Sequence, residues 1–224
     1  MKKISTVISS VILAVLLLSV GNVHATSLYV GGSYSSIASI VNGSVVSEGG
    51  GSIDKSSLDG RQLDYLYCVD LFTVVWHAQT YDFTTVNDSA IIHGSPLYNA
   101  DRVAYLVGKY GVSAANGGYQ GQALQAAIWH EIYAPGVYDL NSQAYGLNSN
   151  VVTLYNQYVA EAAVNTANIS NFLWINPGKN DGSNYQGLVA SLPVPEPGTM
   201  MLLGFGMLTL AIYGKRRIYK EAKA

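Results

Sequence analysis

Cysteine is almost missing from this chain, because Cys68 is the only one among 224 residues. A single cysteine excludes an intramolecular disulfide, which is the usual state of cysteines in an oxidising compartment. Three states remain for Cys68. It is an inert buried residue, it is joined to another molecule, or it is held in some other covalent bond.

Positive charge is scarce in the central part of the chain. Between residues 26 and 194, five Lys and Arg residues stand against twelve Asp and Glu residues, which gives a net charge of −7. Nucleic-acid binding needs a basic face to meet the phosphates, so this balance argues against it. His77, His93 and His130 do not show the paired spacing of metal ligands, and we expect neither a metal nor a cofactor.

The N-terminal 25 residues have the pattern of a secretory signal peptide. Lys2 and Lys3 precede an apolar run over 7–20, and Val23-His24-Ala25 fits a small-residue cleavage site. The alternative is a membrane anchor, but the apolar run is short for a span. We expect the mature chain to begin near Thr26.

The C-terminal end lacks an apolar run of full membrane length. Residues 199–213 offer about fifteen apolar positions, where a bilayer needs roughly twenty, and the basic cluster 215–223 follows. Together with Val194-Pro195-Glu196-Pro197-Gly198, this order resembles the PEP-CTERM sorting signal. The resemblance implies cleavage near Pro197 by an exosortase of a Gram-negative bacterium, and delivery to the outer surface or the extracellular matrix of a biofilm. Membrane contact would then be limited to this transient segment; the alternative is a plain C-terminal anchor.

These boundaries predict a signal peptide over 1–25, one domain over 26–193 and a sorting signal over 194–224. Apolar periodicity and composition predict strands at 28–30, 64–75, 80–86, 172–175 and 187–192, a loop at 48–52, helices at 101–110 and 121–133, and a helix capped by Asn148 or Ser149. Strands, then helices, then strands indicate an α+β fold: a β-sandwich or barrel with a helical insertion.

Two short motifs stand out in that domain: Tyr67-Cys68-Val69-Asp70 and Leu124-Gln125-Ala126-Ala127-Ile128-Trp129. Together they resemble the motifs of bacterial Cys–Gln thioester domains, which occur mainly in surface adhesins. The resemblance implies a bond between the Cys68 sulfur and the Gln125 side-chain carbonyl. It also implies covalent attachment to an amine or hydroxyl on a surface protein or glycan. Such an acyl transfer occurs once per molecule, so the protein would not be an enzyme that turns over.

Other readings of the same residues stay open. Cys68 fits an inert core position, and His130, which is near Gln125 on the expected helix, is a weak candidate for a proton relay. A cysteine hydrolase is a further reading, but the sequence around Cys68 shows no signature of a cysteine-hydrolase family. The main alternative is a non-covalent structural or carbohydrate-binding protein of the exopolysaccharide matrix.

Overall fold

A computed structural model describes residues 26–32, 35–133, 135–192 and 204–207. The chain divides into two units, Met1–Leu192 and Pro193–Ala224, and the fold given below is that of the first. The expected signal peptide and nearly all of the expected sorting signal lie outside the described residues. Among the residues described, no helix is long and apolar enough to cross a membrane.

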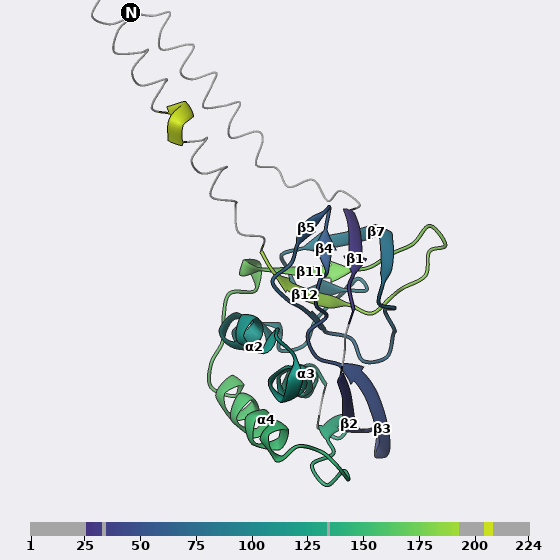
Figure 1. Cartoon of the computed structure of the whole chain (residues 1–224), viewed down its shortest axis with the longest axis vertical. Coiled ribbons are helices and arrows are strands. Elements are labelled where there is room, and N and C mark those ends of the chain that lie inside the picture. Colours follow the sequence, from purple (N-terminus) through teal and green to yellow (C-terminus); the bar gives the residue numbers. More distant parts are fainter. Residues whose placement is uncertain (1–25, 33–34, 134, 193–203, 208–224) are drawn as a thin grey trace, which may run out of the picture. The chain divides into compact units, whose positions relative to one another are not determined.

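A curled, open sheet of seven antiparallel strands forms one side of the first unit (Figure 1). In spatial order its strands are β5 (Arg61–Gln62), β4 (Ser57–Leu58), β1 (Thr26–Val30), β7 (Gln79–Asn87), β11 (Phe172–Asn176), β12 (Leu188–Ser191) and β6 (Leu66–Cys68). The strands expected at 28–30, 80–86, 172–175 and 187–192 are confirmed. β6 is an edge strand, and it is the one that carries Cys68.

Two smaller sheets accompany the large one. The three-stranded sheet has the order β10 (Tyr138–Leu140), β2 (Ser35–Val41) and β3 (Ser44–Gly50), and the two-stranded sheet pairs β8 (Ile91–Ile92) with β9 (Ser95–Pro96). The sequence predicts a loop over 48–52, but residues 48–50 belong to a strand. β3 continues to Gly50, which pairs with Ser35 at the far end of the β2–β3 hairpin.

Three helices lie between β9 and β11 in the sequence: α2 (Ala100–Ala114), α3 (Gly118–Ile132) and α4 (Ser149–Ala162), followed by the short 3-10 helix η1 (Ile169–Asn171). The helical insertion is therefore as expected, while the fold as a whole is largely β with a few helices, and the curled seven-stranded sheet forms a half-barrel. Asn148 caps α4, because its side chain accepts a hydrogen bond from the Asn150 N–H at 2.9 Å.

Helix α3 is the centre of the unit (Figure 1). It contacts α2, α4, β2, β3, β6 and β10. In Figure 1, α2 and α4 lie on one side of it, and β2 and β3 lie on the other. Every residue from Ala123 to Trp129 is buried. The sequence predicts a helix with one apolar face. In the structure, the middle of α3 is packed on all sides and has no face open to solvent. A helix in that position needs apolar or hydrogen-bonded residues on every face.

Candidate functional site

Gln125, near the middle of α3, is a fully buried polar side chain and needs buried partners. The backbone of Cys68 on β6 supplies them. The Cys68 N–H donates to Gln125 Oε1 at 2.9 Å, and Gln125 Nε2 donates to the Cys68 carbonyl oxygen at 2.7 Å. The two residues are 57 positions apart in the sequence, and the fold places them in direct contact.

The position of β6 at the sheet edge explains why this pairing is needed. The next N–H along the chain, that of Val69, donates to the carbonyl of Gly187, the residue before β12. In the described part of the chain, the N–H and C=O groups of Cys68 have no such strand partner, because Cys68 and Leu188 form a pair without ladder hydrogen bonds. Cys68 is only 3% exposed. The side-chain amide of Gln125 therefore takes the place of a neighbouring strand for one residue of the edge.

The electrostatics of the pair have two features that bear on its reactivity. Burial, with a smaller contribution from Asp70, raises the pKa of the Cys68 thiol to about 12, so the thiolate is disfavoured. The Cys68 N–H already points at Gln125 Oε1. A hydrogen bond at that oxygen would stabilise the negative charge that develops there if a nucleophile adds to the Gln125 carbonyl carbon.

A mainly apolar cavity of about 200 Å³ lies beside Cys68. Its walls include Trp129 from α3, Glu48 and Gly50 from β3, and Trp76 and His77 from the segment after β6. Trp129 is fully buried, and among the residues described its indole N–H has no hydrogen-bond partner. Trp76 is 60% exposed, so it reaches from the cavity to the solvent.

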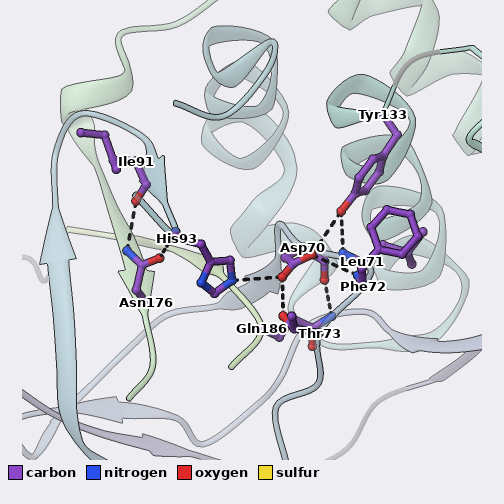
Figure 2. Close-up of polar contacts among 9 residues, drawn as sticks. All are labelled: Asp70, Leu71, Phe72, Thr73, Ile91, His93, Tyr133, Asn176 and Gln186. Atoms are coloured by element: carbon purple, nitrogen blue, oxygen red, sulfur yellow. Dashed lines mark hydrogen bonds and ion pairs between the residues drawn. The ribbon is translucent and has the colours of Figure 1, made fainter. Parts of the chain in front are cut away.

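The segment that follows β6 corrects one expectation. The sequence predicts a strand over 64–75, but the strand ends at Cys68 and residues 69–78 are irregular. The Asp70 carboxylate holds this segment, as Figure 2 shows. It accepts from the Phe72 N–H at 3.0 Å and from the hydroxyl of Thr73.

Asp70 also ties the segment to distant parts of the fold (Figure 2). Its carboxylate accepts from the Tyr133 hydroxyl at 3.3 Å and lies 3.0 Å from His93 Nε2, and Gln186 donates to its backbone carbonyl at 2.5 Å. The Tyr133 hydroxyl in turn accepts from the Leu71 N–H at 2.7 Å. Side-chain hydrogen bonds therefore replace a strand ladder here, and they position the wall of the cavity that contains Trp76 and His77.

The structure does not bring His130, the weak relay candidate, to the pair. Its Nδ1 lies 2.8 Å from the hydroxyl of Tyr155 on α4, which also donates to Asp139 at 2.8 Å. The histidine that shares the cavity with Cys68 is His77. It comes nine residues after Cys68 in an irregular segment, so no periodic pattern assigns it to the site.

The lysines of the domain lie away from the Cys68–Gln125 pair. This matters because the amine of an adjacent lysine would react with the Gln125 carbonyl if that carbonyl were activated. Lys109 Nζ binds Glu161 at 2.6 Å, and Lys179 Nζ donates to Gln79 at 3.1 Å. Lys55 is exposed, and none of the three lines the cavity beside Cys68. Within the described ranges, no group of three or more His, Cys, Asp or Glu side chains is arranged to hold a metal ion.

Gly50 on β3 packs against the site, and it allows a test of the packing. A methyl group there would lie 2.7 Å from Ile37 and 2.8 Å from Gln125. It would also lie 3.0 Å from Trp129. We expect Gly50→Ala to lower the free energy of unfolding by about 1–3 kcal/mol, because the side chains of the site must shift.

The matched control for this substitution is Gly32→Ala. A methyl group at Gly32 meets no atom of the described residues within 4 Å, and Gly32 does not need a left-handed backbone. Chemical denaturation of both variants measures the difference. Equal stabilities of Gly50→Ala and Gly32→Ala would contradict the tight packing of Gln125 against β3.

The comparisons with known proteins concern the far end of the chain. Residues 193–217 match the model of the PEP-CTERM protein-sorting motif. This motif implies export to the cell surface of a Gram-negative bacterium and processing by an exosortase. No curated protein and no solved structure matches the chain.

Proposed function

We propose that this is an exported surface or matrix protein in which Cys68 and Gln125 form an internal thioester, and that the thioester attaches the protein covalently to a partner. The observation that carries the proposal is the contact between the Gln125 amide and Cys68, made across 57 residues in a fully buried site. The sorting motif, which implies export to the cell surface, supports the proposal, because a covalent attachment has a use there.

Bond formation would consume only these two residues. The Cys68 sulfur adds to the Gln125 carbonyl carbon, the Cys68 N–H stabilises the charge on Oε1, and the amide nitrogen leaves as ammonia with the thiol proton. Holding the two reacting groups in place can lower the activation barrier by about 7–11 kcal/mol. Tyr67, Ile128 and Trp129 are fully buried around the pair, and they would protect the product from water.

The finished thioester is an acyl donor. An amine or hydroxyl of the partner attacks the Gln125 carbonyl carbon, the bond to sulfur breaks, and Cys68 is released as a thiol. Each molecule reacts once, so the proposal does not make the protein an enzyme with turnover. A cysteine hydrolase fits less well, because such an enzyme must bring an external substrate to its thiol, whereas Cys68 is buried.

A second candidate function is a non-covalent structural or carbohydrate-binding protein of the extracellular matrix. The observation in its favour is the same pair of hydrogen bonds. They satisfy the backbone of an edge strand, and this gives Gln125 a structural role with Cys68 as an inert core residue. Intact mass separates the two candidates, because only the thioester removes an ammonia.

The sorting motif carries a prediction of its own. We expect protein isolated from the surface of its native host to lack both ends of the chain, because the signal peptide and the tail after Pro197 are removed during export. Peptide mapping by mass spectrometry should find no peptide beyond about Gly198. Recovery of the intact basic tail, Lys215–Ala224, on surface-localised protein would contradict processing by an exosortase.

A further inference from the structure

One long sheet edge has no partner among the described strands. The other edges are short or covered: β5, β8, β9 and β10 have two or three residues each, and Gln125 pairs with the backbone of Cys68 on β6. β3 is an edge strand of seven residues at the outside of the small sheet (Figure 1). It contains neither Pro nor Lys, and it pairs with β2 over its whole length without a bulge. β3 therefore lacks most of the features with which proteins keep other strands away from an edge.

The hydrogen bonds of β2 show which of its backbone groups point toward β3. On the β10 side, the Ala38 carbonyl accepts from the Asn141 N–H at 3.0 Å, and the Asn42 N–H donates to the Val137 carbonyl at 2.9 Å. In an antiparallel sheet, the N–H and C=O of one residue point to one neighbouring strand, and those of the next residue point to the other. The even-numbered residues of β2 therefore bond to β10, and the odd-numbered residues bond to β3.

The same alternation identifies the outward groups of β3. Val41 of β2 lies opposite Ser44, so the even-numbered residues of β3 are the ones that bond to β2. The N–H and C=O groups of Val45, Ser47 and Gly49 then point away from the sheet. All three residues are exposed, and within the described ranges no hydrogen bond to these backbone groups is found.

We propose that a second copy of this chain pairs with β3 as an antiparallel strand, related by a two-fold axis that passes through Ser47. In this register each Ser47 lies opposite its own copy, and each Val45 lies opposite Gly49 of the other molecule. Every outward N–H and C=O finds a partner, so the three residue pairs exchange six hydrogen bonds. The two small sheets become one sheet of six strands. This inference goes beyond the proposed function and does not depend on the thioester.

Hydrogen bonding and charge both favour this register over its neighbours. An axis through Val46 or through Glu48 leaves only two bonded residue pairs within the strand. Glu48 is the only charged residue of β3. An axis through Glu48 also places the two carboxylates directly opposite each other, which is destabilising, whereas the axis through Ser47 places each Glu48 opposite Val46.

The residues of β3 also favour a second copy over an unrelated strand. Val45 is an apolar side chain that is 72% exposed. The strand itself supplies the residue that Val45 faces, Gly49, which has no side chain to obstruct it. A two-fold pair uses the same edge on both molecules, so assembly ends at the dimer and β3 no longer presents an open edge.

Sedimentation of the purified exported protein over a range of concentrations tests the pairing. We expect a monomer–dimer equilibrium. Ser47→Pro should raise the dissociation constant at least about tenfold, because it removes both N–H donors on the axis. The fold should tolerate this change, since the lost N–H points away from β2, and circular dichroism checks it. Ser47→Ala is the matched control, because it keeps the N–H and should keep the dissociation constant of the wild type.

Cross-linking with a short bifunctional thiol reagent tests the register. Ser47→Cys should give a covalent dimer, because the two copies of residue 47 lie about 5.5 Å apart between Cα atoms in a hydrogen-bonded pair. Val45→Cys should not, because its two copies are four residues apart along the strand, roughly 13 Å. Wild-type protein is the background control, since Cys68 is buried.

Three results would overturn the proposal. The first is a wild-type protein that stays monomeric at every concentration, which would leave the β3 edge to a different partner. The second is a dimer that is equally tight in Ser47→Pro and Ser47→Ala, or one that is cross-linked in Val45→Cys and not in Ser47→Cys. The third is an assembly that grows beyond the dimer, which would show that β3 pairs with a different edge of the next molecule.

Discussion

Gln125→Ala is expected to lower the free energy of unfolding by about 2–6 kcal/mol more than Cys68→Ala. Both variants lack the proposed covalent bond, so the difference between them contains the two hydrogen bonds and the difference in the buried volume that each truncation removes. In Cys68→Ala, the Gln125 amide still pairs with the backbone N–H and C=O of residue 68. In Gln125→Ala, both backbone groups lose their partner in a buried site, at about 1–3 kcal/mol each.

Urea unfolding of the two purified variants measures this difference. Gln122→Ala is the matched control on the same helix. Gln122 lies about one turn earlier and donates to the Ser36 carbonyl at 3.1 Å, but it is only half-buried. We expect its loss to cost less than about 1 kcal/mol. Equal stabilities for Gln125→Ala and Cys68→Ala would contradict the role of the amide as a partner of the β6 edge.

The second large effect concerns reactivity. We expect wild-type protein to incorporate methylamine at Gln125 with release of the Cys68 thiol. Cys68→Ala and Gln125→Ala should each abolish the adduct, because either change deletes one half of the bond. Gln122→Ala should retain it. Peptide mapping after incubation with methylamine locates the modified residue.

An adduct on a different glutamine, or an adduct that survives in Cys68→Ala, would show that the Cys68–Gln125 pair is not the acyl donor. A cross-link from Gln125 to Lys55, Lys109 or Lys179 would show that the domain reacts with itself. The structure argues against that outcome, because none of these lysines lines the cavity beside Cys68.

The helices and the longer strands could be predicted from the sequence because their apolar residues repeat with a clear period. α2, α3 and α4 all lie where that pattern indicates them. The β2–β3 hairpin was not predicted, because its strands are rich in Ser and Gly. Its turn does have a signal in the sequence: Asn42-Gly43, with φ of 49° and 78°, has the positive φ values of a tight hairpin turn.

The prediction of a strand over 64–75 is wrong because the composition favours a strand where the structure has none beyond Cys68. The segment is dense in β-branched and aromatic residues, which favour strands, but from Asp70 to Phe72 its backbone bonds to side chains. One carboxylate, that of Asp70, caps the Phe72 N–H and contacts His93 and Tyr133 from other parts of the chain. Local composition cannot reveal these long-range partners, so a propensity argument extends the strand too far.

The candidate site likewise contains residues that could be predicted from the sequence and residues that could not. Cys68 and Gln125 could be named from two motifs and a resemblance, while their contact depends on the packing of α3 against β6. His77 and the unpaired N–H of Trp129 could not be assigned, because both belong to the cavity only through the path of an irregular segment and the burial of a helix.

Thiol reagents alone cannot test the bond. Burial raises the pKa of Cys68 to about 12, so the thiolate that such reagents need is scarce at neutral pH whether or not a thioester exists. Resistance of the folded protein to alkylation is therefore expected in both cases. The mass of the protein does not have this ambiguity.

Intact-protein mass spectrometry of freshly purified exported protein tests the central claim most directly. With the termini defined by peptide mapping, the account predicts a mass lower than that of the sequence by one ammonia, and the deficit should disappear in Cys68→Ala and Gln125→Ala. A mass equal to that of the full sequence, in protein that has not met a nucleophile, would contradict the thioester and favour the non-covalent matrix protein.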